Sequence, residues 1–148
     1  MWGCGRRAPG EGPGGFGLDA ADHCLFATGE NKMMTMMDTE SRKVVASVPI
    51  GEHVDGCEFD EARQLAFASC GDGTTTIAHE DAPDRLSVVQ VLATERSART
   101  MALDPKTQRI YLPSAQFEPP TSPAPGAKPA WPKMVPKTMK LLVYGPSA

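Results

Sequence analysis

The sequence lacks a long apolar run, and it lacks an excess of basic charge. The longest apolar candidates, such as VVQVL at residues 88–92, have the length of a strand, whereas a bilayer-spanning helix needs roughly 20 apolar residues. The formal net charge is −3, and phosphate binding depends on clustered Lys and Arg. We therefore expect no membrane span and no nucleic-acid partner.

Signals of export and of a disulfide or zinc framework are also lacking. Gly and Pro follow Arg6 and Arg7 where a secretion signal would carry about 7 to 15 apolar residues, so no signal peptide is visible. The four cysteines, at positions 4, 24, 57 and 70, form no Cys-x-x-Cys pair. Three of them stand in or beside strand-like runs, where a free Cys packs as a small apolar residue. The redox compartment stays open.

Composition divides the chain into regions. Residues 1–16 are rich in Gly and poor in apolar side chains, so we expect a flexible tail. Residues 17–148 carry the strand-like runs. Within them, a Pro-rich insertion at 113–139 is expected to form an extended loop.

A repeat organises the rest of the sequence. An aspartate preceded by an apolar residue recurs at positions 19, 60 and 104, with steps of 41 and 44 residues. Each is followed seven residues later by an aromatic residue: Phe26, Phe67 and Tyr111. A period of about 40 to 45 residues with short β-branched or alternating runs indicates β-propeller blades rather than helical repeats. The predicted fold is all-β, built from blades of four antiparallel strands.

Three blade-like units follow from the repeat, at about 17–56, 57–100 and 101–148. In the second unit the expected strands are 56–60, 64–69, 74–79 and 86–92, and the third unit resumes after its insertion at 140–145. Propellers have about four to eight blades, so three units predict an incomplete ring with two apolar faces and sheet edges open. Either the chain is the C-terminal part of a longer propeller, or several chains close the ring together.

The motifs also carry a resemblance. The turn LDPK, the strand RIYL, the turn GDGT and the run KVVASVPIG resemble the YVTN-type β-propeller repeat of YncE-like proteins. The resemblance covers residues 17–115 and 140–145. It departs from the pattern at MMTMM, which replaces a Val and Ile run, and in the second unit, which lacks Asp-Thr after its third strand. It implies a propeller, often seven-bladed, in the periplasm or outside the cell.

The resemblance also suggests where a ligand would bind. In the family arrangement the segment before each first strand approaches the central channel. VDGCEFD aligns with ARTMALD, which places Asp55 and Arg99 in equivalent positions. Together with His53 they are the candidate ligand-binding residues at the channel mouth. Two alternatives follow for the opposite charges of Asp55 and Arg99: they bind a polar ligand, or they pair with each other or with water.

Other candidate chemistry is weaker. The groups His53, Asp55 and Glu58, and His79, Glu80 and Asp81, contain metal-ligating residue types, but two converging side chains do not make a site. We interpret both groups as surface residues and predict no metal, no cofactor and no catalytic residue. In MMTMM, Met34 and Met36 share one strand face, which favours packing between sheets over soft-metal binding.

The sequence thus favours a non-catalytic binding or scaffold module. Its partner is a small ligand or a protein that the sequence does not identify, and the open blade faces allow self-association. The alternative is a fragment of a propeller enzyme, lactonase-like or quinone-dependent dehydrogenase-like, whose catalytic residues lie mostly outside this chain. A third hypothesis is an interaction through the Lys- and Pro-rich residues 116–137.

Overall fold

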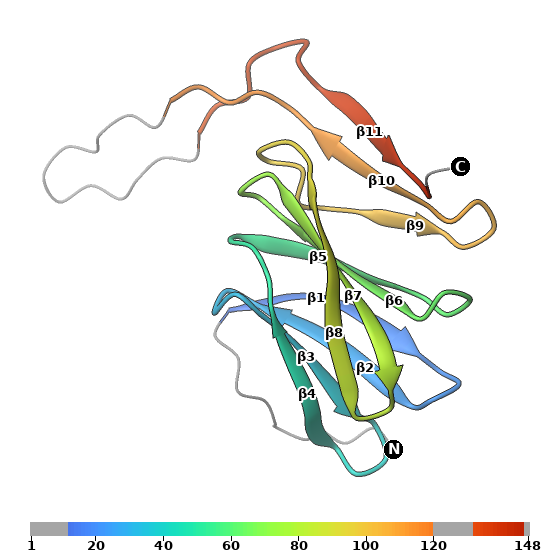
Figure 1. Ribbon diagram of the computed structural model, residues 1–148. Coiled ribbons are helices and arrows are strands. Elements are labelled where there is room, and N and C mark those ends of the chain that lie inside the picture. Colours follow the sequence, from blue (N-terminus) through green and yellow to red (C-terminus); the bar gives the residue numbers. More distant parts are fainter. Residues whose placement is uncertain (1–11, 120–131, 147–148) are drawn as a thin grey trace, which may run out of the picture.

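The computed structural model describes residues 12–119 and 132–146, which form three antiparallel sheets (Figure 1). Sheet 1 contains β1 (Pro13–Asp19), β2 (Cys24–Gly29), β3 (Met33–Asp38) and β4 (Lys43–Pro49). Sheet 2 contains β5 (Val54–Asp60), β6 (Leu65–Cys70), β7 (Thr74–Ala82) and β8 (Arg85–Ala93). Sheet 3 contains β9 (Ala102–Asp104), β10 (Arg109–Ser114) and β11 (Lys140–Tyr144). In these ranges no helix has the length and hydropathy to span a membrane.

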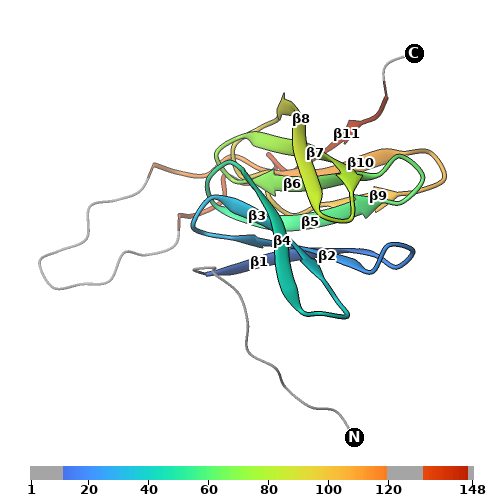
Figure 2. The same cartoon turned by 60° about the horizontal axis from the view of Figure 1, so that its bottom comes forward.

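Sheet 2 lies between the other two sheets, and the view in Figure 2 shows the same order. Sequential strands are neighbours in sheets 1 and 2, and the delayed strand after the Pro-rich insertion is β11, which pairs with β10. The all-β fold with four-stranded antiparallel units is therefore confirmed for the first two units. The third unit has three strands in the described residues.

The boundary of the N-terminal tail requires a correction. Residues 13–16 were expected in a flexible tail, but they belong to β1, which pairs with β2. The glycines there have a packing role, because a Cβ at Gly15 would lie 2.4 Å from the backbone nitrogen of Cys57. They allow β1 and β5 to approach each other closely. Residues 1–11 lie outside the described part of the chain.

The boundary between the first two units also shifts. Residues 54–56 were expected to end the first unit, but they begin β5 and belong to sheet 2. Gly56 is buried there, and a Cβ would lie 2.5 Å from the Ser69 hydroxyl. The inner strands of sheets 1 and 2 therefore start earlier than their apolar residues suggest.

The repeating aspartates shape the turn after the first strand of each sheet. Asp19 Oδ1 accepts a hydrogen bond from the Ala21 backbone N–H at 2.8 Å, and Asp60 and Asp104 each accept one from the residue two positions later. The fourth residue after each aspartate has a positive φ: His23, Gln64 and Gln108. These are Asx turns closed by a left-handed residue, a geometry that Asp supports through its short acceptor side chain.

Two hydrophobic clusters lie between the sheets. Met34 and Met36 are fully buried between sheets 1 and 2, as their shared strand face predicts. Phe26 of β2 stacks on Phe59 of β5 with ring centroids 4.7 Å apart. A second cluster joins sheets 2 and 3 around Phe67 and Leu112. Sheet 2 therefore contributes to both clusters.

Three cysteines belong to this packing. Cys24, Cys57 and Cys70 are buried free thiols, as the strand pattern predicts. Burial raises the pKa of Cys24 and of Cys57 to about 12, and that of Cys70 to about 11. They are held as neutral apolar side chains. Cys4 lies outside the described residues.

The outward faces of sheets 1 and 3 are open. On sheet 1, Phe16 and Leu18 are 64% and 58% exposed, and on sheet 3, Leu141 and Val143 are 59% and 49% exposed. These residues alternate with buried residues on β1 and with half-buried residues on β11, so each outer sheet presents a second apolar face. This is the arrangement expected of an incomplete ring.

Candidate functional site

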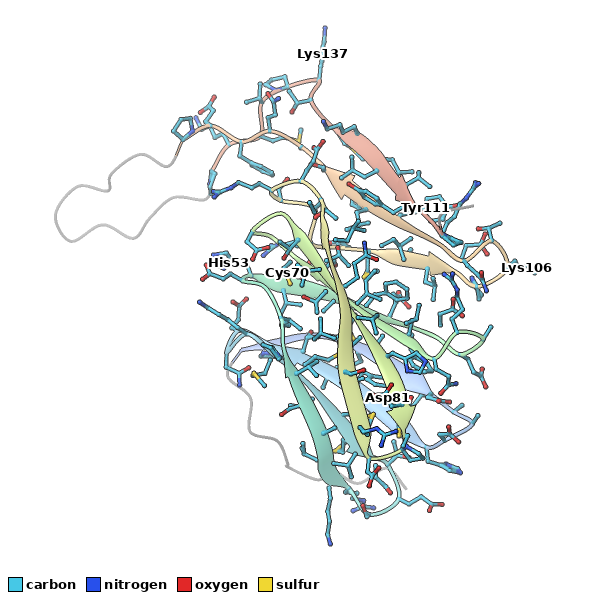
Figure 3. All side chains as sticks on the ribbon, viewed as in Figure 1. His53, Cys70, Asp81, Lys106, Tyr111 and Lys137 are labelled. Atoms are coloured by element: carbon cyan, nitrogen blue, oxygen red, sulfur yellow. The ribbon has the colours of Figure 1, made fainter. Side chains whose placement is uncertain are left out.

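One end of the sheets carries the three residues that the sequence selected. This rim consists of the β2–β3 turn at 30–32, the β4–β5 connection at 50–53, the β6–β7 turn at 71–73 and the β8–β9 connection at 94–101, together with the first residues of β5. Figure 3 places His53 near Cys70 at this end, away from Asp81 and Lys106.

Backbone hydrogen bonds fix the rim. The N–H of Ile50 donates to the Lys32 carbonyl at 3.0 Å, which ties the first connection to its own sheet. The N–H of Gly71 donates to the His53 carbonyl at 3.0 Å, and that of Ser97 donates to the Gly71 carbonyl at 3.1 Å. The β6–β7 turn is thus held between the two connections, so the rim side chains stand on constrained backbone.

The predicted residues separate into two contacts. Asp55 Oδ2 lies 3.9 Å from Arg99 Nε and accepts a hydrogen bond from the Thr100 hydroxyl at 2.9 Å. The two charged residues at equivalent positions therefore pair with each other, which is one of the alternatives that the sequence left open. His53 contacts Glu30 instead, with Nδ1 at 3.8 Å from Oε2. All four side chains are between 44% and 68% exposed.

Gly71 lies between the two contacts. A Cβ there would come within 3.1 Å of the Cβ of His53 and 3.6 Å of Arg99 Cδ. The absence of a side chain at this turn position leaves room for both His53 and Arg99 beside one backbone segment. In the sequence, Gly71 stood out only as the first residue of the GDGT turn.

Further charges on the rim were missed by the sequence reasoning. Lys32 Nζ lies 2.5 Å from Glu52 Oε1, which raises the pKa of Lys32 and lowers that of Glu52. Glu95 Oε1 lies 2.8 Å from Lys140 Nζ, and this contact lowers the pKa of Glu95. Burial raises the pKa of Asp72, but the N–H of Glu52 and Thr74 outweigh it, so that pKa is lowered. Glu30 and Asp72 both stand in the turn after the second strand of their sheets, so alignment of the repeats could have found them.

The rim exposes charged groups of both signs. Its acidic and basic side chains are partly exposed and already paired, and a partner can exchange with these pairs without leaving a charge buried. Such a surface suits recognition of a polar partner.

The opposite rim corrects one prediction. His79, Glu80 and Asp81 were interpreted as surface residues, but Glu80 is only 3% exposed. Asp81 faces outward and pairs with His79 at 2.8 Å and with Arg85 at 3.7 Å. Strand alternation directs Glu80 inward, toward sheet 1.

An apolar groove between sheets 2 and 3 was also missed. It has a volume of about 360 Å³, and its apolar lining comes from Leu65, Phe67, Ile77, Leu92, Ile110 and Tyr144. Between sheets 1 and 2 the outer strands β4 and β8 contact each other, whereas the described part of sheet 3 has no fourth strand to do the same. The groove is therefore open where a fourth strand of sheet 3 would pack, and this depends on the three-dimensional arrangement of the sheets.

The Pro-rich insertion is only partly described. Residues 120–131, which include Pro129 and Trp131, lie outside the described residues. At the two ends of the insertion, the N–H of Glu118 donates to the Lys133 carbonyl at 2.8 Å, and that of Val135 donates to the Gln116 carbonyl at 2.9 Å. These ends are therefore paired rather than freely extended.

Comparisons with known proteins identify the fold. No family model and no curated protein matches the sequence. Among solved structures, hydrazine synthase of Kuenenia stuttgartiensis superposes with a TM-score of 0.64 and 10% identity, over 81% of this chain and 34% of that one. Sqt1 of Saccharomyces cerevisiae superposes with a TM-score of 0.63 and 9% identity, over 71% and 29%. A mitotic checkpoint complex structure gives 0.54 and 16%, over 61% and 30%.

These similarities show the fold alone. The neighbours have β-propeller folds, so the three sheets are propeller blades. The chain spans about a third of the length of the structures that it matches.

Proposed function

We propose that this chain is a non-catalytic binding module of the β-propeller type, related to the YncE-like proteins, that binds a protein segment of mixed charge at its rim. The observation that carries the proposal is the rim itself, where pairs of opposite charge stand on hydrogen-bonded turns from two neighbouring blades. Rigid turns reduce the entropy lost on binding, and exposed pairs exchange partners at low cost.

A protein segment fits this surface better than a small molecule. The charged pairs extend over three loops and the first residues of β5 and β11 rather than converging into one enclosed pocket. Alternating acidic and basic groups on a partner would match them, and complementarity of this kind gives specificity and fast association.

The second part of the proposal concerns the open faces of the first and third blades. Their exposed apolar side chains need cover, and each blade in a propeller is covered by its neighbours. We propose that further blades cover them, and that in preparations of this chain alone a second copy supplies these blades. Location in the periplasm or outside the cell stays part of the YncE-like proposal.

Peptide binding tests the rim. An array of 12-residue peptides, sorted into mixed-charge, acidic, basic and neutral classes, is probed with the wild type at low salt. We expect the mixed-charge class to bind best, with affinity that falls as salt is added, because exposed charges are screened. Arg99→Ala should weaken these peptides at least tenfold, and His53→Ala should weaken them to a lesser degree.

Lys106→Ala is the matched control. Lys106 is an exposed cation at the other end of the sheets, in the turn between β9 and β10, so its removal should leave peptide binding unchanged. Equal binding of neutral peptides, or equal loss in the Arg99 and Lys106 variants, would contradict the proposal.

A further inference from the structure

Three carboxylates meet where the first blade packs against the second. Asp19 and Asp22 come from the β1–β2 turn of sheet 1, and Glu80 comes from β7 of sheet 2. One carboxylate oxygen from each lies within 4.8 Å of the other two. Asp19 is fully buried and Glu80 is 3% exposed, while Asp22 is exposed and opens the cluster to solvent.

Three buried carboxylate oxygens in this cluster have no partner with hydrogen-bond geometry in the described residues. Asp19 Oδ1 accepts hydrogen bonds from the N–H of Ala21 and Asp22, but Asp19 Oδ2 accepts none. Neither carboxylate oxygen of Glu80 has a partner with full hydrogen-bond geometry. The groups beside it are the Cys24 thiol, a weak donor, and the Asp19 carboxyl, which can share a hydrogen bond with Glu80 only if one of the two is protonated. A buried polar atom without a partner is costly, and one explanation for such an atom is an ion that completes the site.

Cationic side chains do not fill this role. In the described residues, the ion pairs formed by nearby cations go to Asp81, which accepts both His79 and Arg85. The β7 backbone fixes Glu80 in place, because its N–H donates to the Gln64 carbonyl at 2.9 Å. Three carboxylates held so close repel one another unless a cation or a proton lies between them.

The donor set selects the kind of cation. Carboxylate oxygens are ligands for hard cations. Asp19 Oδ2, the two oxygens of Glu80 and the carboxylate of Asp22 supply about four or five of the roughly six to eight oxygens that Ca²⁺ takes, and water can complete the shell from the exposed side. Mg²⁺ requires a stricter octahedron and usually keeps several of its own waters.

We propose that Asp19, Asp22 and Glu80 form a divalent-cation site that binds Ca²⁺ and joins the first blade to the second. The ligands come from both blades, so bound Ca²⁺ stabilises their packing and binds the folded chain in preference to the unfolded one. This site is at the opposite end of the sheets from the peptide-binding rim, and it does not depend on the function proposed for that rim.

Calcium titration tests the site directly. The chain is dialysed against EDTA and then against metal-free buffer at pH 7, and CaCl₂ or MgCl₂ is added during isothermal titration calorimetry and thermal unfolding. We expect one Ca²⁺ per chain, weaker binding of Mg²⁺, and a rise in Tm of about 5 °C at saturating Ca²⁺. Asp22→Asn should weaken Ca²⁺ at least tenfold, and its exposed position leaves folding intact. Glu80→Gln should abolish binding.

Asp60→Asn is the matched control. Asp60 occupies the same turn position in the second blade, is buried, and has an unpartnered Oδ2, but it does not belong to the carboxylate cluster. The Asp60→Asn variant should bind Ca²⁺ with the same affinity as the wild type. The proposal is overturned if the wild type binds no Ca²⁺, or if Asp22→Asn binds it as tightly as Asp60→Asn does. A third result would also overturn it: the Tm of the wild type does not change when Ca²⁺ is added, and Glu80→Gln in EDTA has a Tm about 5 °C above that of the wild type in EDTA. A proton shared between the carboxylates would then explain the cluster.

Discussion

At the scale of single residues, the aspartate turns are the part of the structure that the sequence predicts best. Asp38 forms the same kind of Asx turn between β3 and β4. Its Oδ1 accepts hydrogen bonds from the N–H groups of Glu40 and Ser41, and Arg42 has a positive φ. The geometry depends on residues within four positions of the aspartate. Local sequence is therefore sufficient to predict it.

Contacts between blades were harder to predict at this scale. Asp55 and Arg99 were found through the equivalence of two repeats, but the His53–Glu30 contact joins the turn of one blade to the connection that follows it. The burial of Glu80 depends on how the β1–β2 turn lies against β7. Neither spacing nor composition encodes these distances, which packing sets.

Glu58 gives a prediction about pH. Burial raises the pKa of Glu58 above its ordinary value of 4.5. Unfolding exposes this carboxyl, so the unfolded chain releases the proton at a lower pH than the folded chain does. Glu58 therefore lowers stability as pH rises above about 4.5, and it has no effect well below that value. Glu58→Gln should raise the Tm at pH 7, and the gain should vanish near pH 3.

The exposed Glu61 provides the comparison for this measurement. Glu61→Gln should shift the Tm much less than Glu58→Gln at either pH. A pH-independent gain in Glu58→Gln would show that the substitution acts through something other than the half-buried charge.

At the scale of strands, the sequence predicts the boundaries in sheet 2 to within one to three residues. In sheet 2 the expected strands at 64–69 and 74–79 became Leu65–Cys70 and Thr74–Ala82. The largest error was the start of β1, because glycine is counted as flexible when its neighbours in space are unknown. Here Gly15 and Gly17 are required because β5 packs directly on them.

Gly15→Ala tests this explanation. The new Cβ would lie 2.4 Å from the Cys57 nitrogen and 2.9 Å from the Gly56 carbonyl carbon, and backbone of a buried strand cannot move aside easily. Overpacking of this kind costs about 1–3 kcal/mol, so chemical denaturation should show a loss in that range.

Gly145→Ala is the control for the close approach of β1 and β5. Its Cβ would meet the flexible Arg109 side chain at 3.1 Å, which can shift, so we expect a change within about 0.5 kcal/mol. Equal effects in the two variants would contradict the packing role of Gly15.

At the scale of the whole molecule, the repeat period was sufficient to predict propeller blades, and the solved structures agree. The period carries this information because each repeat is one structural unit stacked on the next. Identities of 9% to 16% to those structures carry no information on partners.

The open faces determine how the chain behaves in solution. Phe16 and Leu18 on the first blade and Leu141 and Val143 on the third are apolar where a closed ring would bury them. Two copies would bring six sheets together, a number within the roughly four to eight blades of known propellers. We therefore predict a dimer.

The most direct test is the mass of the purified chain by light scattering after gel filtration, with far-ultraviolet circular dichroism on the same peak. We predict a single β-rich species with twice the 15.8 kDa mass of one chain. A β-rich species that remains at 15.8 kDa as concentration rises would contradict the claim that further blades must cover the two open faces.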